Sequence, residues 1–124
     1  GFAAAADWFA SLDHAALREH EQALYAACTA GLRQVPGLRL VGTAPERTGA
    51  ISFVMEGAHP ADLANILDME GVAIRAGHHC AQPIMDRFAI PATARISFGC
   101  YSDQEDVDQA LAALHKAARL FGLG

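Results

Sequence analysis

Apolar residues recur at helical spacing over the first thirty-odd residues of the chain. The predicted apolar face of the second of two helices consists of Leu17, Leu24, Cys28 and Leu32. Asp13 is suited to cap this helix, and the pattern is interrupted just before it, over residues 11–14. Pro36-Gly37 ends the helical stretch. We therefore predict two successive helices before residue 36.

The opening of the chain carries large apolar side chains in an alanine-rich context. Phe2, Trp8 and Phe9 lie among alanines, and no capping residue precedes them. This start is typical of a helix that continues from a longer chain, and we expect the sequence to be part of one.

The middle of the chain changes to strand patterning. Residues 38–41 and 51–55 predict two strands, joined by a polar loop over Thr43–Gly49. Pro60 suits the first position of a short helix, and Asp62 is favourable in its first turn. The apolar face of that helix is Leu63, Ile66 and Leu67.

The last third predicts two strands and a helix. Val72–Arg75 predicts a short strand, followed by a connection rich in small and polar residues as far as Pro83. Residues 93–99 alternate, with one apolar face and one face that carries Thr93, Arg95, Ser97 and Gly99. Ser102 to Glu105 form a capping-box pattern for the final helix. Its apolar stripe is Val107, Leu111, Leu114, Ala118 and Phe121.

The order of elements predicts an α+β fold, a small mixed or antiparallel sheet packed against helices, formed by residues 1–124 as a single domain. The hydrophobic fraction of 52% is inflated by alanine, which buries little area. We therefore expect the core to depend on the scattered leucine, isoleucine, valine, phenylalanine and methionine side chains.

Charge and cysteine usage exclude several classes of function. The net charge is −5 and no basic run is present, which disfavours nucleic-acid binding. No apolar stretch approaches the roughly 20 residues that cross a bilayer, and no signal-peptide pattern is visible at the start. The three cysteines, Cys28, Cys80 and Cys100, do not describe a disulfide framework. We expect a cytoplasmic protein that contacts neither membrane nor nucleic acid.

The segment from Gly71 to Pro83 carries the candidate chemistry. Cys80 follows a predicted strand, in a loop where a thiol can be exposed and held rigidly, and Gly77 permits a tight turn. Arg75, His78 and His79 lie within five residues of this thiol. The thiolate is the reactive form of cysteine, and positive neighbours favour it.

Arg95 lies on the polar face of the next predicted strand. If that face and the Cys80 loop border the same cleft, the guanidinium groups of Arg75 and Arg95 flank the thiol. A guanidinium binds a carboxylate in a two-pronged fork, which suits an amino-acid substrate. The alternative for Arg95 is a surface or ion-pairing role.

The other candidate residues have simpler interpretations. A buried cysteine usually fills the core, which is how we interpret Cys28, and we also interpret Cys100 as structural. Solvated surface positions are expected for His14, His20, His59 and His115. A zinc site at His78, His79 and Cys80 is an alternative. However, three consecutive residues do not readily turn toward one tetrahedral centre, and no CxxC or HxxxH pair supports them. No metal is predicted.

The run from Arg75 to Pro83, RAGHHCAQP, closely resembles the active-site cysteine loop of SUF-type (group II) cysteine desulfurases and selenocysteine lyases, in the class V aminotransferase family. The resemblance continues in residues 94–98 with Tyr101, and in the helix start at residues 105–108. The turn at residues 35–38 and the strand at 49–53 extend it over essentially the whole chain.

The resemblance implies the small C-terminal domain of a fold-type-I enzyme that uses pyridoxal phosphate. It implies that Cys80 is the nucleophile, which takes the sulfur of a substrate cysteine as a persulfide while alanine is released. Arg95 matches the arginine that binds the substrate carboxylate, and Arg75 matches a second active-site arginine. Gly77, His78 and His79 belong to the loop motif without separate roles.

The large cofactor-binding domain of such enzymes has no counterpart in this chain. Its one lysine, Lys116, lies in the last helix, where a solvated helix-end role is expected rather than a Schiff base with the cofactor. The resemblance therefore implies pyridoxal phosphate in a parent enzyme and none bound to this chain, which we expect to be inactive alone.

The partners that the resemblance implies are L-cysteine or L-selenocysteine as substrate and a sulfur-acceptor protein serving iron–sulfur cluster assembly. It also implies a homodimeric parent. The alternatives are a selenocysteine lyase and a cofactor-free persulfide carrier that uses Cys80.

Overall fold

Two helices open the chain, as the apolar spacing predicts. In the computed structural model, which describes residues 1–42, 44, 47 and 49–124, they are α1 (Phe2–Ala10) and α2 (His14–Leu32). The Asp13 side chain caps α2 by accepting hydrogen bonds from the backbone N–H groups of Ala15 and Ala16. Within the predicted Thr43–Gly49 loop, positions 43, 45, 46 and 48 lie outside the described residues.

One antiparallel sheet holds the four strands that the structure describes. They are β1 (Leu38–Val41), β2 (Ala50–Met55), β3 (Arg75–Gly77) and β4 (Thr93–Ser97). Their order across the sheet is β1-β2-β4-β3, and each neighbouring pair is antiparallel. The loop that carries Cys80, between β3 and residue 82, therefore leaves the sheet at the β3 edge, which is the edge opposite β1.

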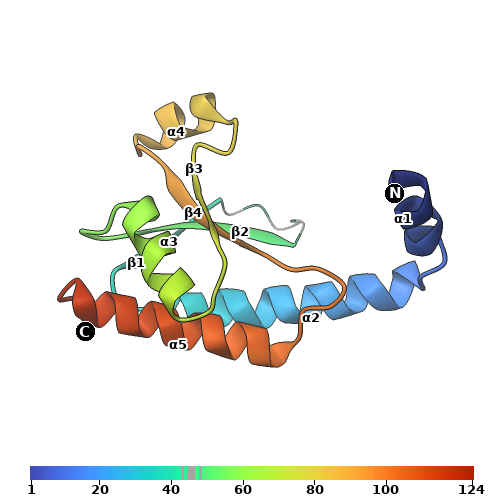
Figure 1. Cartoon of the computed structure of the whole chain (residues 1–124). Coiled ribbons are helices and arrows are strands. Elements are labelled where there is room, and N and C mark those ends of the chain that lie inside the picture. Colours follow the sequence, from blue (N-terminus) through green and yellow to red (C-terminus); the bar gives the residue numbers. More distant parts are fainter. Residues whose placement is uncertain (43, 45–46, 48) are drawn as a thin grey trace.

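Helices pack against the sheet and against one another. Helix α5 (Gln104–Leu120) runs alongside α2 beneath the strands, and α3 (Pro60–Met69) contacts α5, β3 and β4 (Figure 1). The Nδ1 atom of His59 accepts a hydrogen bond from the Ala61 N–H, so this surface histidine caps α3. The α+β fold class predicted from the sequence is confirmed.

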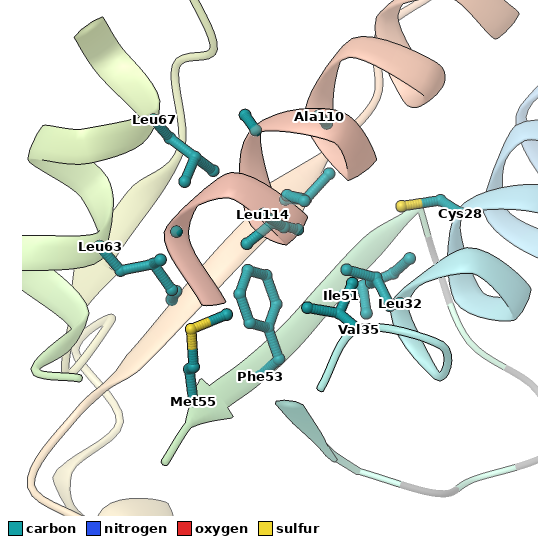
Figure 2. Close-up of a cluster of buried hydrophobic side chains, with 14 of the residues drawn as sticks. Cys28, Leu32, Val35, Ile51, Phe53, Met55, Leu63, Leu67, Ala110 and Leu114 are labelled. Carbon is teal, nitrogen blue, oxygen red and sulfur yellow. The ribbon is translucent and has the colours of Figure 1, made fainter. Parts of the chain in front are cut away.

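The core fills the space between this sheet face and the helices. Figure 2 shows the Phe53 ring between Leu63 and Leu114 on the helix side and Ile51 along its own strand. Alternate residues of β2 and β4 point into this space, as their period of two requires. Alanines of α5 are buried with them, because a small side chain lets helix and sheet approach closely; they are Ala110, Ala113, Ala117 and Ala118. The core therefore depends on alanine as well as on the larger apolar side chains that the sequence analysis singled out, although each alanine buries little area.

The strand predicted at Val72–Arg75 is wrong in position. The strand is Arg75–Gly77, because these residues pair in register with 95, 94 and 93 of β4. Val72 and Ile74 instead pack against the core from a segment without strand pairing. The predicted strand at 93–99 likewise ends at Ser97.

Helix α4 (Gln82–Phe88) was not predicted. It has seven residues and one buried side chain, Met85, too few to produce a helical stripe. Its last turn ends at Ala89, which adopts a left-handed conformation with φ of 52°. This helix leads the chain from the candidate loop back to β4 (Figure 1).

The capping box of α5 is displaced by one residue from its predicted position. Asp103 is the N-cap, and its carboxylate accepts from the N–H groups of Glu105 and Asp106. The Asp106 carboxylate accepts from the Asp103 N–H in return. The Ser102 hydroxyl instead accepts from the Gly99 N–H, so the serine stabilises the preceding turn.

Candidate active site

Two arginines lie directly opposite one another on neighbouring strands. Arg75 of β3 pairs with Arg95 of β4, and Arg95 pairs on its other side with Ser52 of β2. Because Ala94 and Ile96 point into the core, the alternation of β4 places Arg95 on the other face of the sheet. Cross-strand partners share a face, so the structure brings both guanidinium groups to the same side.

Cys80 lies at an exposed position between β3 and α4. Gly77, at the end of β3, has a φ of 134°, a conformation that glycine adopts at low cost. His79 and Cys80 follow with φ of 55° and 57°, both left-handed. A turn bond from the Ala81 N–H to the His78 carbonyl, 2.9 Å long, closes the loop before α4 begins. The thiol is therefore presented to solvent at the tip of a tight turn.

The turn stores conformational strain at the candidate nucleophile. A left-handed conformation costs roughly 1–2 kcal/mol for a residue with a side chain, and here two such residues are adjacent. Strain of this kind persists only where surrounding contacts hold it, and it occurs preferentially at functional sites. The sequence indicates the turn through Gly77 but does not reveal the conformation of His79 and Cys80.

A contact that holds the turn runs from His79 to β4. Its Nε2 atom lies 3.2 Å from the carbonyl oxygen of Thr93 and 3.0 Å from the Thr93 hydroxyl. Thr93 is completely buried and pairs with Gly77 across the sheet. Thr93 was placed on the polar face by the sequence, but its role as an anchor was missed, because no local pattern links residues 79 and 93.

Burial and nearby positive charges disfavour the protonated form of the His79 imidazole, whose pKa is lowered. Burial lowers the pKa of His79 below its usual value, and the neighbouring charges of Arg95, Arg75 and His78 lower it further. The hydrogen bond to the Thr93 backbone acts in the opposite direction. Arg75 and Arg95 are cross-strand partners, and His79 bonds to Thr93, two residues before Arg95, so these three residues lie together where the Cys80 loop leaves β3.

Two atoms of this cluster are buried without a hydrogen-bond partner in the part of the chain that the structure describes. They are Nε of Arg95 and Nδ1 of His79. An unsatisfied buried polar atom costs about 1–3 kcal/mol, so two in one cluster are unusual. Arg95 as a whole is half-buried, so part of its side chain is accessible from solvent.

His78 and Gly77 are the remaining residues of the loop motif. His78 is exposed to solvent, and no atom lies close to the position that a Cβ would take at Gly77. Glycine is required at residue 77 because of its backbone conformation rather than because of crowding.

The other cysteines are separate from this site. Cys28 is completely buried, which confirms its assignment to the core, and burial raises the pKa of its thiol to about 11. Cys100 is half-buried. All three thiols are free.

The lysine and several of the histidines make specific contacts. Lys116 is exposed, as predicted, and its ammonium also donates a 2.6 Å hydrogen bond to the Glu70 carboxylate. His20 Nε2 lies 2.7 Å from the Ser102 carbonyl oxygen, and the His14 ring meets Phe9 edge-on. His14, His20 and His59 are exposed, as predicted, and His115 is half-buried.

A surface hollow of about 350 Å³ lies at the opposite edge of the sheet. It is lined by Arg33, Leu38, Arg39, Leu40, Gly42 and Arg47. Since β1 and β3 are the two edge strands, this hollow is distinct from the Cys80 loop.

The described residues form neither a metal-binding cluster nor a membrane-spanning helix. No group of three or more histidine, cysteine, aspartate or glutamate side chains there is placed to hold a metal ion. No helix among them combines the length and apolar character needed to cross a membrane.

Known proteins share both sequence and fold with this chain. The aminotransferase class-V family model matches residues 1–110. A probable cysteine desulfurase from Vibrio cholerae is 45% identical over 118 residues, which cover 95% of this chain and 29% of that protein. A cysteine desulfurase from Synechococcus elongatus is 41% identical over 116 residues, covering 94% and 18% respectively.

A solved structure agrees with these relatives. The cysteine desulfurase CsdA from Escherichia coli, in its S-sulfonic acid form, superimposes with a TM-score of 0.84 at 29% identity. The match covers 92% of this chain and 28% of that one. The chain thus spans less than a third of the length of each relative.

Proposed function

Because this chain belongs to the aminotransferase class-V family, we propose that it is the small C-terminal domain of a cysteine desulfurase and supplies the sulfur-accepting thiol, Cys80. The observation that carries the proposal is the exposed Cys80 turn, which follows β3, the strand on which Arg75 pairs with Arg95 of β4. The names of the relatives and the coverage of about 29% support it.

The arginines suit recognition of the substrate. We propose that Arg95 binds the α-carboxylate of L-cysteine, since its half-buried side chain lies on the sheet face that it shares with Arg75, and a guanidinium binds a carboxylate with two parallel hydrogen bonds. Arg75, opposite on β3, adds a second positive charge to the same face. Together they would hold the substrate so that its sulfur meets the Cys80 thiolate.

The sulfur then moves to Cys80. The Cys80 thiolate attacks the substrate sulfur and forms a new sulfur–sulfur bond as the carbon–sulfur bond breaks. The electron pair of the broken bond, with a proton, stays on the carbon product, which is released as alanine. The persulfide on an exposed loop is accessible to a sulfur-acceptor protein.

The cofactor of the parent enzyme does not fit the residues of this chain. Pyridoxal phosphate, which the family implies, supplies an electron sink and is held through a lysine. The one lysine here, Lys116, is paired with Glu70 on the helix side of the molecule. We therefore propose that the cofactor is held outside this chain, by a large domain that the remaining two thirds of the relatives would supply.

The proposal extends to the compartment, the oligomeric state and the sulfur acceptor of the parent enzyme. The parent would work in the cytoplasm as a homodimer, and its acceptor would pass sulfur to iron–sulfur cluster assembly. Selenocysteine is an alternative substrate, because selenium and sulfur are attacked by the same thiolate chemistry.

A chimera tests the proposal. This chain would replace the matching 28% of the Escherichia coli relative, and alanine release from L-cysteine would be measured. We expect alanine together with one added sulfur on Cys80, a loss of at least about 100-fold in Cys80→Ser, and a raised KM in Arg95→Gln. A chimera that binds the cofactor but releases no alanine would contradict the proposal, as would robust alanine release by this chain alone.

The alternative function is a cofactor-free persulfide carrier. The exposed Cys80 in a chain without a suitable cofactor lysine favours it. Treatment of the chain with a sulfane-sulfur donor, followed by intact-mass measurement, tests it. A single added sulfur that disappears in Cys80→Ser supports a carrier, and the absence of any adduct counts against it.

A further inference from the structure

We propose that His79 is a positioning residue, which fixes the Cys80 thiol relative to Arg95 through a hydrogen bond to strand β4. The proposal rests on the proposed role of Cys80 as the sulfur acceptor. His79 directly precedes Cys80, and its Nε2 atom reaches Thr93, fourteen residues later, at 3.2 Å from the carbonyl and 3.0 Å from the hydroxyl oxygen.

The anchor at the other end of this bond is rigid. Thr93 is completely buried, pairs with Gly77 across the sheet and lies two residues before Arg95 on the same strand. Residues two apart on a strand share a face. One side chain therefore connects the neighbour of the thiol to the strand face that holds Arg95.

Nε2 of His79 has two possible partners on Thr93. It donates to the carbonyl oxygen when it carries the ring hydrogen, and it accepts from the hydroxyl when Nδ1 carries that hydrogen, so either tautomer joins His79 to Thr93. Nδ1 is buried without a partner in the described part of the chain, beside two guanidinium groups that disfavour a further positive charge. The orientation of the ring is therefore set by the contact of Nε2 with Thr93.

The turn needs such a connection. His79 and Cys80 have φ of 55° and 57°, and the chain immediately around them contributes one turn bond, from the Ala81 N–H to the His78 carbonyl. A left-handed pair of this kind relaxes toward ordinary backbone conformations unless a contact opposes it. The bond to Thr93 holds His79 in its left-handed conformation. Because Cys80 is the next residue, its position is restricted as well.

Two substitutions separate the hydrogen bond from the backbone preference. Glutamine places a side-chain N–H close to the position of Nε2, so His79→Gln can keep the bond to Thr93. Asparagine tolerates the left-handed conformation well but is too short to reach Thr93. His78→Gln serves as the matched control, because His78 is exposed and adjacent.

The experiment uses the cofactor-free chain and two readouts. Amide hydrogen exchange of Ala81 reports the turn, and the pH profile of Cys80 alkylation by iodoacetamide reports the surroundings of the thiol. We expect His79→Asn to accelerate Ala81 exchange at least about 10-fold and to change the alkylation profile, with the thermal midpoint of the fold retained. His79→Gln and His78→Gln should remain within about 2-fold of the unmodified chain.

Two results would overturn the proposal. One is an unchanged rate of Ala81 amide exchange in His79→Asn. The other is an Ala81 exchange rate that rises as much in His79→Gln as in His79→Asn. If His79→Asn does not fold, nitrogen NMR of the unmodified chain decides, at a pH where the rings are neutral: an Nε2 chemical shift displaced from that of the exposed His78 supports the bond, and the same shift for both residues refutes it. None of these readouts needs alanine formation, so they stand apart from the chimera test.

Discussion

At the scale of single residues, Arg75 and Arg95 occupy positions that stability alone would not favour. Like charges directly opposite on neighbouring strands repel each other. We expect Arg75→Gln to raise the free energy of unfolding of this chain by about 0.5 kcal/mol, and by less at high salt, because ions screen exposed charges. Urea unfolding at two ionic strengths measures this difference.

The control for this variant is Arg39→Gln. Arg39 is also an exposed strand arginine, but its cross-strand partner is Val54, so its removal relieves no repulsion from a directly opposite charge. A gain in stability of the same size in both variants would show that the repulsion is not the cause.

Cys28 supplies a prediction about pH. Its pKa is about 11 in the folded chain and about 9.0 when unfolded. Between these values the unfolded chain loses the thiol proton more readily, so alkali stabilises the unfolded state. We expect the free energy of unfolding to fall by roughly 1 kcal/mol per pH unit from pH 9 to 11 through this thiol, and to be unaffected by it below pH 9.

Comparison with Cys28→Ala isolates this contribution. The alanine variant will be less stable at neutral pH because it leaves a cavity, but its stability should decline less steeply above pH 9. Parallel pH profiles for the two proteins would contradict the prediction.

At the scale of elements, the start of α5 shows how a sequence pattern can be correct in kind and wrong by one residue. Ser102 to Glu105 and Asp103 to Asp106 both have the spacing of a capping box. The structure uses Asp103 as the cap and leaves Ser102 to the preceding turn. Local spacing cannot choose between overlapping boxes, because the choice depends on where α5 meets the core through Val107.

Unfolding experiments can distinguish Asp103 from Ser102 as the cap of α5. We expect Asp103→Ala to lower the free energy of unfolding by about 1 kcal/mol, because it leaves two backbone N–H groups of α5 without their acceptor. Ser102→Ala removes only the acceptor of the Gly99 N–H and should cost less. Thermal or urea unfolding of the two variants tests the order, and an equal or larger loss in Ser102→Ala would reverse the assignment.

Long periodic elements were predictable from the sequence, and the parts fixed by distant contacts were not. Helices α2 and α5 and strand β2 follow from their apolar spacing. Strand β3 depends on its register with β4, and α4 is too short to show a period. At the site, the loop motif predicted an exposed Cys80, and the alternation of residues 93–99 predicted that Arg95 lies off the core face; the structure agrees with both placements. The bond from His79 to Thr93 depends on tertiary structure alone.

At the scale of the whole molecule, the chain has one well-packed body and one helix that stands apart. Helix α1 has no buried residue, and it lies beyond the far end of α2 (Figure 1). Its large side chains are exposed: Phe2 at 91%, Trp8 at 55% and Phe9 at 50%. Exposed apolar side chains on one helix are typical of a surface that contacts another protein body. In the proposed parent, the large domain is the natural candidate.

This arrangement predicts that removal of residues 1–12 leaves the fold intact. We expect the thermal midpoint of the truncated chain to stay within about 2 °C of the full chain, since the truncation removes no buried core side chain. We also expect weaker self-association by analytical ultracentrifugation, because the exposed apolar helix is gone. Trp8, the one tryptophan, should show water-exposed fluorescence in dilute full-length chain that changes little on unfolding. A midpoint lowered by more than about 5 °C would mean that α1 contributes to the core after all.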